Sequence, residues 1–139
     1  MQENPAPQQP ATPPEQLTPQ ERDARLWNML CHLSALAIFV IPGIGNILGP
    51  LIVWQIKKNE IPSVEVHGKA SLNFQITVSI AMLAGLVAFF ALACIGIGFL
   101  FIALIPAIGL AGLVFTVIAG IKANDGKDYR YPWTLTLVK

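Results

Sequence analysis

The charges of this chain are confined to its ends and to one short internal segment. Lys69 and Lys122 bracket 52 residues without a single Asp, Glu, Lys, Arg or His. A second run, residues 26–56, holds 31 residues of which only Cys31 and His32 are titratable. A mostly apolar stretch of about 18 or more residues is long enough to cross the hydrocarbon core of a bilayer. The sequence therefore predicts an integral membrane protein.

The composition favours lipid over water as the surrounding solvent. Hydrophobic residues make up 54% of the 139 residues and charged residues 12%, against about 25% charged in ordinary soluble domains. A soluble fold of this length could not bury so much apolar surface. The net charge of +1 gives no reason to expect nucleic acid as a partner.

The first twenty residues differ from the rest. They contain six prolines and five glutamines but no Lys or Arg, too little apolar surface to offset the entropy of ordering. We expect a disordered cytoplasmic tail over residues 1–20 and a helical membrane domain over residues 21–139. Thr18, Pro19 and Glu21 have the pattern of a capped helix start, which marks this boundary.

A sharp break interrupts the first apolar run. It contains Pro42, Gly43 and Gly45, with Pro50 shortly after. Two readings remain open: one long kinked crossing, or a helical hairpin with a short second arm. Non-helical backbone at membrane depth is tolerated only where protein or water satisfies it. The break is therefore expected to be sheltered or to lie in the far headgroup layer.

The second apolar run is predicted to form two long helices, from about Val64 to Leu92 or Ala93 and then to about Ala123, with a turn at residues 94–98. A helix stop follows at residues 124–126, where Gly126 can adopt a left-handed cap. The predicted fold is all-α: a polytopic integral membrane helical bundle. It has two helical hairpins made of four membrane segments, the second segment short, with three crossings as the alternative.

The positions of the charges favour the hairpin reading. Lys and Arg near the ends of membrane helices prefer the cytoplasmic side. The hairpin reading places all nine of them there, whereas a single crossing leaves Arg22 and Arg25 outside. We predict a protein of the bacterial cytoplasmic membrane with both termini in the cytoplasm. The turns at 42–46 and 94–98 would then lie on the far side.

A polar stripe marks the first part of the long helix. His67, Ser71, Gln75 and Ser79 recur every four residues and share one helix face, with Asn73 on an adjacent stripe. The stripe could line a path or a binding groove. Alternatively it could join helices through hydrogen bonds, each contributing about 0.6 kcal/mol in membranes. Because several such residues are needed to hold a bundle, the second interpretation is favoured.

The sequence offers neither a metal site nor a catalytic centre. A metal site needs three or four ligands. His32 and His67 are the only two histidines, and neither apolar run contains an Asp or Glu that could join them. Hydrolysis would need an activated nucleophile or paired carboxylates. Cys31 and Cys94 are expected toward opposite faces, too far apart for a disulfide. We therefore predict a protein that is not an enzyme and has no cofactor.

Five stretches together resemble a known family. They are residues 32–34, 42–46 with Pro50, 67–75, 121–126 and 129–132. They are similar to a family of small bacterial membrane proteins that is grouped with the Tic-type ("Tic-twenty") subunit of the chloroplast inner-envelope protein import machinery. The likeness covers about residues 26–137, and Asn73-Phe74-Gln75 is its most specific element.

The resemblance implies an all-helical membrane domain with helical hairpins and no active site. Because the plastid relatives are associated with a protein-conducting channel, it also implies a link to protein translocation. We therefore expect a non-catalytic interaction or assembly component, surrounded by the lipid bilayer and bound to a membrane-protein partner or to further copies of itself. The alternative is a small channel or transporter subunit whose path is lined by the polar stripe.

Overall fold

The fold is all-α, as predicted. The computed structural model describes residues 16–139, of which none forms a strand, so the predicted N-terminal tail lies almost entirely outside the described residues. The α-helices carry the labels α and the short 3-10 helices the labels η. In chain order they are α1 (Pro19–Leu33), η1 (Ser34–Phe39), α2 (Gly45–Lys57), α3 (Pro62–Leu92), η2 (Ala93–Ile95), η3 (Ile97–Leu100) and α4 (Phe101–Asn124). Residues 125–139, the C-terminal segment, are not helical.

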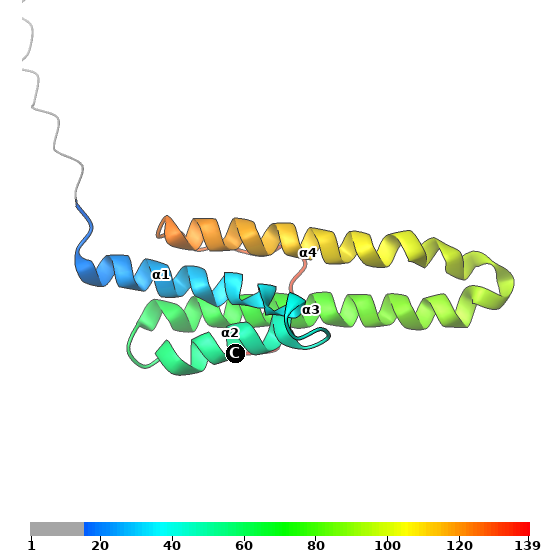
Figure 1. Ribbon diagram of the computed structural model, residues 1–139, viewed down its shortest axis with the longest axis horizontal. Helices are drawn as coiled ribbons and strands as arrows, with labels where there is room; N and C mark the ends of the chain where they lie inside the picture. Colours follow the sequence, from blue (N-terminus) through cyan, green and yellow to red (C-terminus); the bar gives the residue numbers. More distant parts are fainter. Residues whose placement is uncertain (1–15) are drawn as a thin grey trace, which may run out of the picture.

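The helices form two antiparallel hairpins that lie side by side (Figure 1). The short hairpin consists of α1, η1 and α2, and the long hairpin of α3 and α4. In the short hairpin, Gly45 and Gly49 of α2 approach the backbone of Ala37 and Ser34 so closely that a Cβ atom would overlap it. Gly43 has a φ of +93° in the turn between the arms. The break therefore reverses the chain, which excludes a single kinked crossing.

The two hairpins differ in reach. At 1.5 Å per residue, the 31 residues of α3 span about 46 Å and the 13 residues of α2 about 20 Å. The turn of the short hairpin lies about halfway along the long one (Figure 1), and Asn46 beside this turn donates a hydrogen bond to Ser79 in α3. The turns at 42–46 and 94–98 thus lie at different levels of the molecule, not together at one face.

Sequence signals at the helix ends account for the boundaries. The Thr18 hydroxyl accepts a hydrogen bond from the backbone N–H of Glu21 at 3.2 Å, and the Glu21 carboxylate accepts one from the Thr18 N–H at 2.8 Å, so the capping box forms. Pro62 occupies the first position of α3, where its missing N–H costs nothing. Gly126, with a φ of +76°, follows the end of α4.

The long hairpin exposes apolar side chains along its outer half. The helical stretches Pro62–Ile95 and Ile97–Asn124 are long and apolar enough to cross a membrane. Only 6% and 11% of their most apolar windows are buried, which is unlike a core helix of a soluble protein. The exposed side chains toward the turn include Leu83, Leu86, Val87, Phe90, Phe99, Leu100, Ile102 and Leu104.

The opposite end of the bundle gathers aromatic and basic side chains. We call it the charged end, and the turn at residues 93–100 the apolar tip. At the charged end, the ammonium groups of Lys57 and Lys58 lie 4.9 Å from the ring centres of Trp27 and Trp54 respectively. Trp and Tyr beside basic residues are typical of a membrane–water interface. The distribution of side chains therefore distinguishes one wet end from one apolar end.

Candidate functional site

The polar stripe predicted on α3 is turned inward. His67, Ser71, Asn73 and Gln75 are buried, and Ser79 is half-buried. The five side chains do not meet at one site. Four of them divide among three clusters, each with partners from another part of the chain, and the Ser71 hydroxyl has no hydrogen-bond partner among the described residues.

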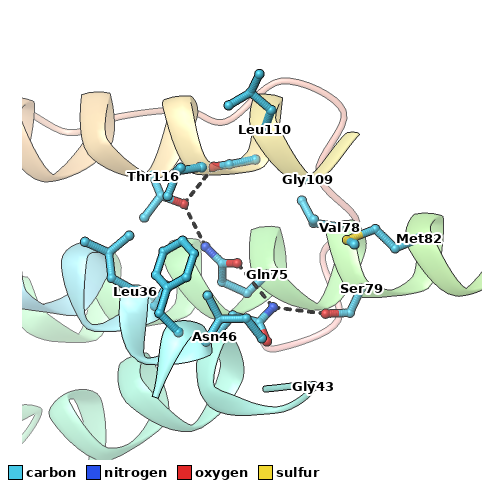
Figure 2. A pocket seen from close by; sticks show the side chains of 15 residues that line it. Leu36, Gly43, Asn46, Gln75, Val78, Ser79, Met82, Gly109, Leu110 and Thr116 are labelled. Carbon is cyan, nitrogen blue, oxygen red and sulfur yellow. Dashed lines mark hydrogen bonds between the residues drawn. The ribbon is translucent and has the colours of Figure 1, made fainter. Parts of the chain in front are cut away.

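The first cluster lies where the short hairpin turns. Asn46 donates through Nδ2 to Gln75 Oε1 at 3.3 Å and to Ser79 Oγ at 3.0 Å (Figure 2). Gln75 in turn donates through Nε2 to Thr116 Oγ1 at 2.8 Å, and the Thr116 hydroxyl donates to the carbonyl of Gly112 at 2.8 Å. This network joins α2, α3 and α4, as interhelical hydrogen bonding requires.

A cavity of about 540 Å³ adjoins this network. Figure 2 shows it between the turn of the short hairpin and the middle of the long one. Apart from the side chains of the network, its lining is apolar or glycine: Ala35, Leu36, Ile38, Phe39, Gly43, Val78, Met82, Gly109, Leu110, Gly112 and Leu113. Such a lining suits a hydrocarbon chain better than an ion or a polar solute.

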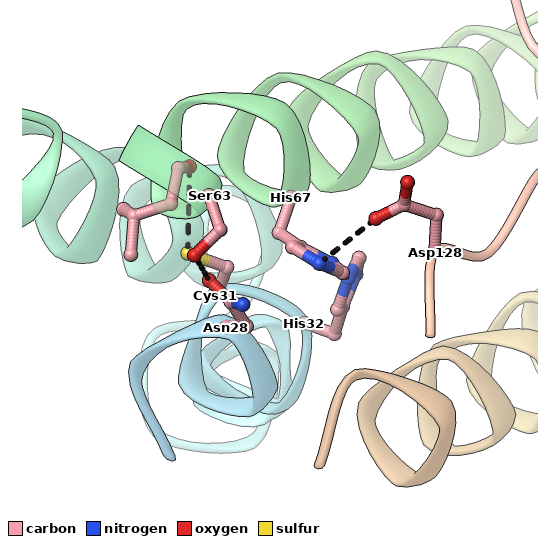
Figure 3. Close-up of polar contacts among 7 residues, drawn as sticks. Asn28, Cys31, His32, Ser63, His67 and Asp128 are labelled. Atoms are coloured by element: carbon pink, nitrogen blue, oxygen red, sulfur yellow. Dashed lines mark hydrogen bonds and ion pairs between the residues drawn. The ribbon is translucent and has the colours of Figure 1, made fainter. Parts of the chain in front are cut away.

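The second cluster joins two histidines near the charged end. His32 Nδ1 lies 2.8 Å from the Tyr131 hydroxyl, and His32 Nε2 lies 3.0 Å from His67 Nδ1. His67 Nε2 then lies 3.3 Å from a carboxylate oxygen of the exposed Asp128 (Figure 3). One continuous chain of contacts therefore links α1, α3 and the C-terminal segment.

The partners of the two rings fix the direction of these hydrogen bonds. The ionised Asp128 carboxylate offers only acceptors, so the direction is set from that end of the chain of contacts, and at the other end the Tyr131 hydroxyl donates to His32 Nδ1. His32 then donates from Nε2 to His67 Nδ1, and His67 donates from Nε2 to the Asp128 carboxylate. Both imidazoles are satisfied in the neutral form with the proton on Nε2.

This pairing leaves little scope for metal binding. All four ring nitrogens of His32 and His67 have a partner within the chain, so no pair of free lone pairs converges on one point. Within residues 16–139, no three or more His, Cys, Asp or Glu side chains are grouped as a metal site requires. The arrangement joins three segments of the chain instead.

The third cluster holds the C-terminal segment against α3. Asn73 Oδ1 accepts hydrogen bonds from the backbone N–H groups of Leu137 at 2.8 Å and Val138 at 2.7 Å, and Asn73 Nδ2 donates to the Val138 carbonyl at 3.0 Å. Thr77 Oγ1 accepts from the N–H of Leu135 at 3.0 Å. The Tyr131 ring stacks on Phe74 with centroids 4.0 Å apart.

Sequence reasoning missed this docking of the C-terminal segment. It gave residues 134–138 no role. The alternation of Thr and Leu over residues 134–137 is a signal of extended structure. That signal could have identified a segment in need of partners, though not which helix supplies them.

The remaining candidate residues have structural positions. Pro42 and Gly43 lie exposed in the turn of the short hairpin, whereas Gly45 and Pro50 are buried between its arms. Ser71 is fully buried, and its hydroxyl makes no hydrogen bond with any residue that the structure describes. Cys31 and Cys94 are both free; Cys31 is buried, and Cys94 is exposed at the apolar tip.

A protein-family model matches most of this chain. The model of the MamF/MmsF family, described as the magnetosome magnetite crystal formation protein family, matches residues 23–138. No curated protein and no solved structure matches the chain. The family is one of bacterial membrane proteins, as expected, but the match gives no support to the resemblance to the Tic-type import subunit.

Proposed function

Because this chain belongs to the magnetosome magnetite crystal formation protein family, we propose that it is a non-catalytic assembly component of a bacterial membrane, with the magnetosome membrane as its setting. One observation carries the proposal: the outer half of the long hairpin is apolar, exposed and free of charge. In a membrane, this surface is open to lipid and to other membrane proteins.

The side chains of the bundle support a role without catalysis. The polar groups of Gln75, Asn46 and Thr116 pair with one another, and those of His32 and His67 pair across the bundle. A catalytic centre needs a nucleophile or acid–base pair that can reach a substrate. The polar side chains of these clusters instead hold segments of the chain together, with the Asn46 amide oxygen as the atom that has no partner among the described residues.

For the topology, we propose that the charged end faces the cytoplasm and that only the long hairpin crosses the bilayer. From Lys69 to Leu92, α3 covers about 35 Å, enough for a hydrocarbon core of about 30 Å. The short hairpin then enters from the cytoplasmic side and turns at mid-depth. Pro42 has no N–H, and the N–H groups of Val40, Ile41 and Gly45 are bonded within the turn, which lowers the cost of placing it at that depth. Within the described residues the N–H groups of Gly43 and Ile44 have no partner, so at mid-depth they require water or a neighbouring molecule.

The channel alternative has less support. A conducting path needs polar groups that face water, whereas Gln75 and Ser79 are bonded to Asn46 and the adjoining cavity is apolar. Cysteine at Ser71, Gln75 or Ser79 should therefore resist aqueous thiol reagents in native membranes. Rapid reaction at all three positions would favour the channel.

Crosslinking in native membranes tests the assembly role. A photo-crosslinking residue at Phe90, which is 67% exposed, should yield a discrete adduct larger than the monomer. The same residue at the buried Leu72 serves as the matched control and should crosslink only within the chain. Recovery of monomer alone from position 90 would contradict an assembly role.

The magnetosome setting has its own test. In a magnetosome-forming bacterium, the chain fused to a fluorescent protein should be enriched in magnetically purified magnetosomes relative to the remaining membranes. Equal abundance in both fractions would remove the magnetosome from the proposal and leave the assembly role standing.

A further inference from the structure

The cross-section of the molecule changes halfway along its length. From the charged end to the level of Ser79, α1 with η1, α2, α3 and α4 lie side by side, and the C-terminal segment docks on α3 (Figure 1). Beyond that level, of residues 16–139 only α3 and α4 with the turn that joins them continue to the apolar tip. Each helix with its side chains is about 10 Å across. The half at the charged end is therefore wider by two helices and the C-terminal segment.

We call the half at the charged end the wide half and the half that ends at the apolar tip the narrow half. The width of the wide half is fixed by the packing of its helices. Gly68 of α3 lies against Trp54 of α2, where a Cβ atom would come within 2.7 Å of the indole. Gly120 of α4 lies equally close to Leu33 of α1. The histidine pair and the three hydrogen bonds of Asn73 add further links across this half. The wide half thus behaves as one packed unit with a fixed width.

The narrow half has an exposed apolar surface on the side where the short hairpin ends. Met82, Gly109 and Leu110 line the apolar cavity at this step together with Phe39 of the short hairpin. Farther out, Leu86, Phe90 and the residues near the tip are exposed. Lipid chains of the far leaflet can therefore occupy the space that the short hairpin leaves open.

We propose that the chain is a membrane wedge, which favours bilayers curved so that the leaflet around the charged end is convex. The inference rests on the proposed topology, in which the wide half occupies one leaflet and the narrow half the other. Each molecule then takes more area from the first leaflet than from the second. A bilayer relieves this mismatch by bending so that the crowded leaflet becomes convex. A membrane that is already curved in this sense accepts the molecule more readily.

Sorting among vesicles of different size tests the wedge. The full-length chain with Cys94→Ser and a dye on Glu60→Cys, at the charged end, is reconstituted into a mixture of small and large vesicles. Cys31 is buried, so the dye marks residue 60. An impermeant quencher then separates molecules whose charged end faces outward from those whose charged end faces the lumen, and single-vesicle imaging gives the density of each.

The two orientations provide an internal control. Outward-facing molecules place the wide half in the convex leaflet, so their density should be several-fold higher on small vesicles than on large ones. Lumen-facing molecules should show the opposite trend. A density independent of vesicle size in both orientations, or the same trend in both, overturns the wedge. The crosslinking result at Phe90 does not depend on this outcome.

Paired substitutions on the lipid-facing surface sharpen the test. Ala91→Phe with Ala103→Phe widens the narrow half at two exposed positions and should weaken the preference of outward-facing molecules for small vesicles. Ile52→Phe with Val117→Phe adds bulk at exposed positions of the wide half and should preserve or strengthen it. Equal effects of the two pairs would contradict the wedge, since both add aromatic surface to lipid.

Discussion

Asn73 satisfies three backbone groups of the C-terminal segment with one side-chain amide. An amide can do so because it offers both an acceptor and a donor in one plane, like the backbone itself. Its burial could be predicted from the cost of an unpaired amide in hydrocarbon. Its partner could not, because nothing local to residue 73 identifies residues 137 and 138.

Loss of this amide should release the end of the chain. Asn73→Leu removes three hydrogen bonds, or about 2 kcal/mol at about 0.6 kcal/mol each. Hydrogen exchange at the amides of Leu137 and Val138 should become faster. Thr77→Val is the matched control, since it should accelerate exchange only at Leu135. Unchanged protection in Asn73→Leu would show that the segment is held by other contacts.

The Tyr131 hydroxyl is the donor that begins the histidine chain. Tyr131→Phe keeps the stack on Phe74 but leaves His32 Nδ1 without a partner in a buried site. We expect a loss of about 1–3 kcal/mol in the free energy of unfolding, measured by denaturation in detergent. Tyr129→Phe should have little effect, because this half-buried residue makes no side-chain hydrogen bond with the described residues. Equal stability of both variants would contradict the proposed pairing.

The same hydroxyl predicts sensitivity to alkali. Burial raises the pKa of Tyr131 in the folded chain, whereas an unfolded Tyr titrates near pH 10. The unfolded state therefore loses its proton first, so this contribution to stability is complete below about pH 10 and falls as the pH rises above it. The wild type should lose more stability than Tyr131→Phe between about pH 9 and about pH 11. Parallel losses would place the alkaline transition elsewhere.

At the scale of the elements, local signals were sufficient for most boundaries. Thr18 with Glu21 predicted the start of α1 and Gly126 the end of α4, each because a particular side chain or φ angle satisfies a helix end. The reversal of the chain at Pro42–Gly45 was left open between two readings. The close approach of Gly45 and Gly49 to η1 decides it, and that is a contact between elements.

This close approach predicts an unusual response to alanine. Within a helix, Gly→Ala normally stabilises by about 1 kcal/mol. Gly49→Ala in α2 should instead destabilise by about 1–3 kcal/mol, because the new methyl overlaps the backbone of Ser34. Gly109→Ala in α4 is the control, since its Cβ would meet only the Met82 side chain at 3.7 Å or more. Thermal unfolding measures the stability of both variants. If Gly49→Ala stabilises the protein, the packing of the short hairpin is contradicted.

At the scale of the whole molecule, the positions of the charges indicated from which side of the membrane the hairpins enter, but not how deep each turn lies in the bilayer. The exclusion of Lys, Arg, Asp and Glu from both apolar runs indicated two hairpins entering from one face. A charge-free turn gives no sign of how far it reaches, so the turns at 42–46 and 94–98 were placed together. The structure separates them because Asn46 beside the first turn pairs with Ser79, about 15 Å beyond Lys69. Depth was determined by a contact between remote residues.

The depth of Val40 in the bilayer decides whether the short hairpin is re-entrant. Val40, in the turn, is 81% exposed, and Ile97, at the apolar tip, is 51% exposed, so each accepts a spin label through cysteine in a Cys94→Ser background. Collision with oxygen and with a water-soluble relaxation agent measures the depth of each label. We predict residue 40 near the bilayer centre and residue 97 near the far headgroups. Equal depths for both, at the far headgroups, would mean that the short hairpin crosses the bilayer and that the protein is not a wedge.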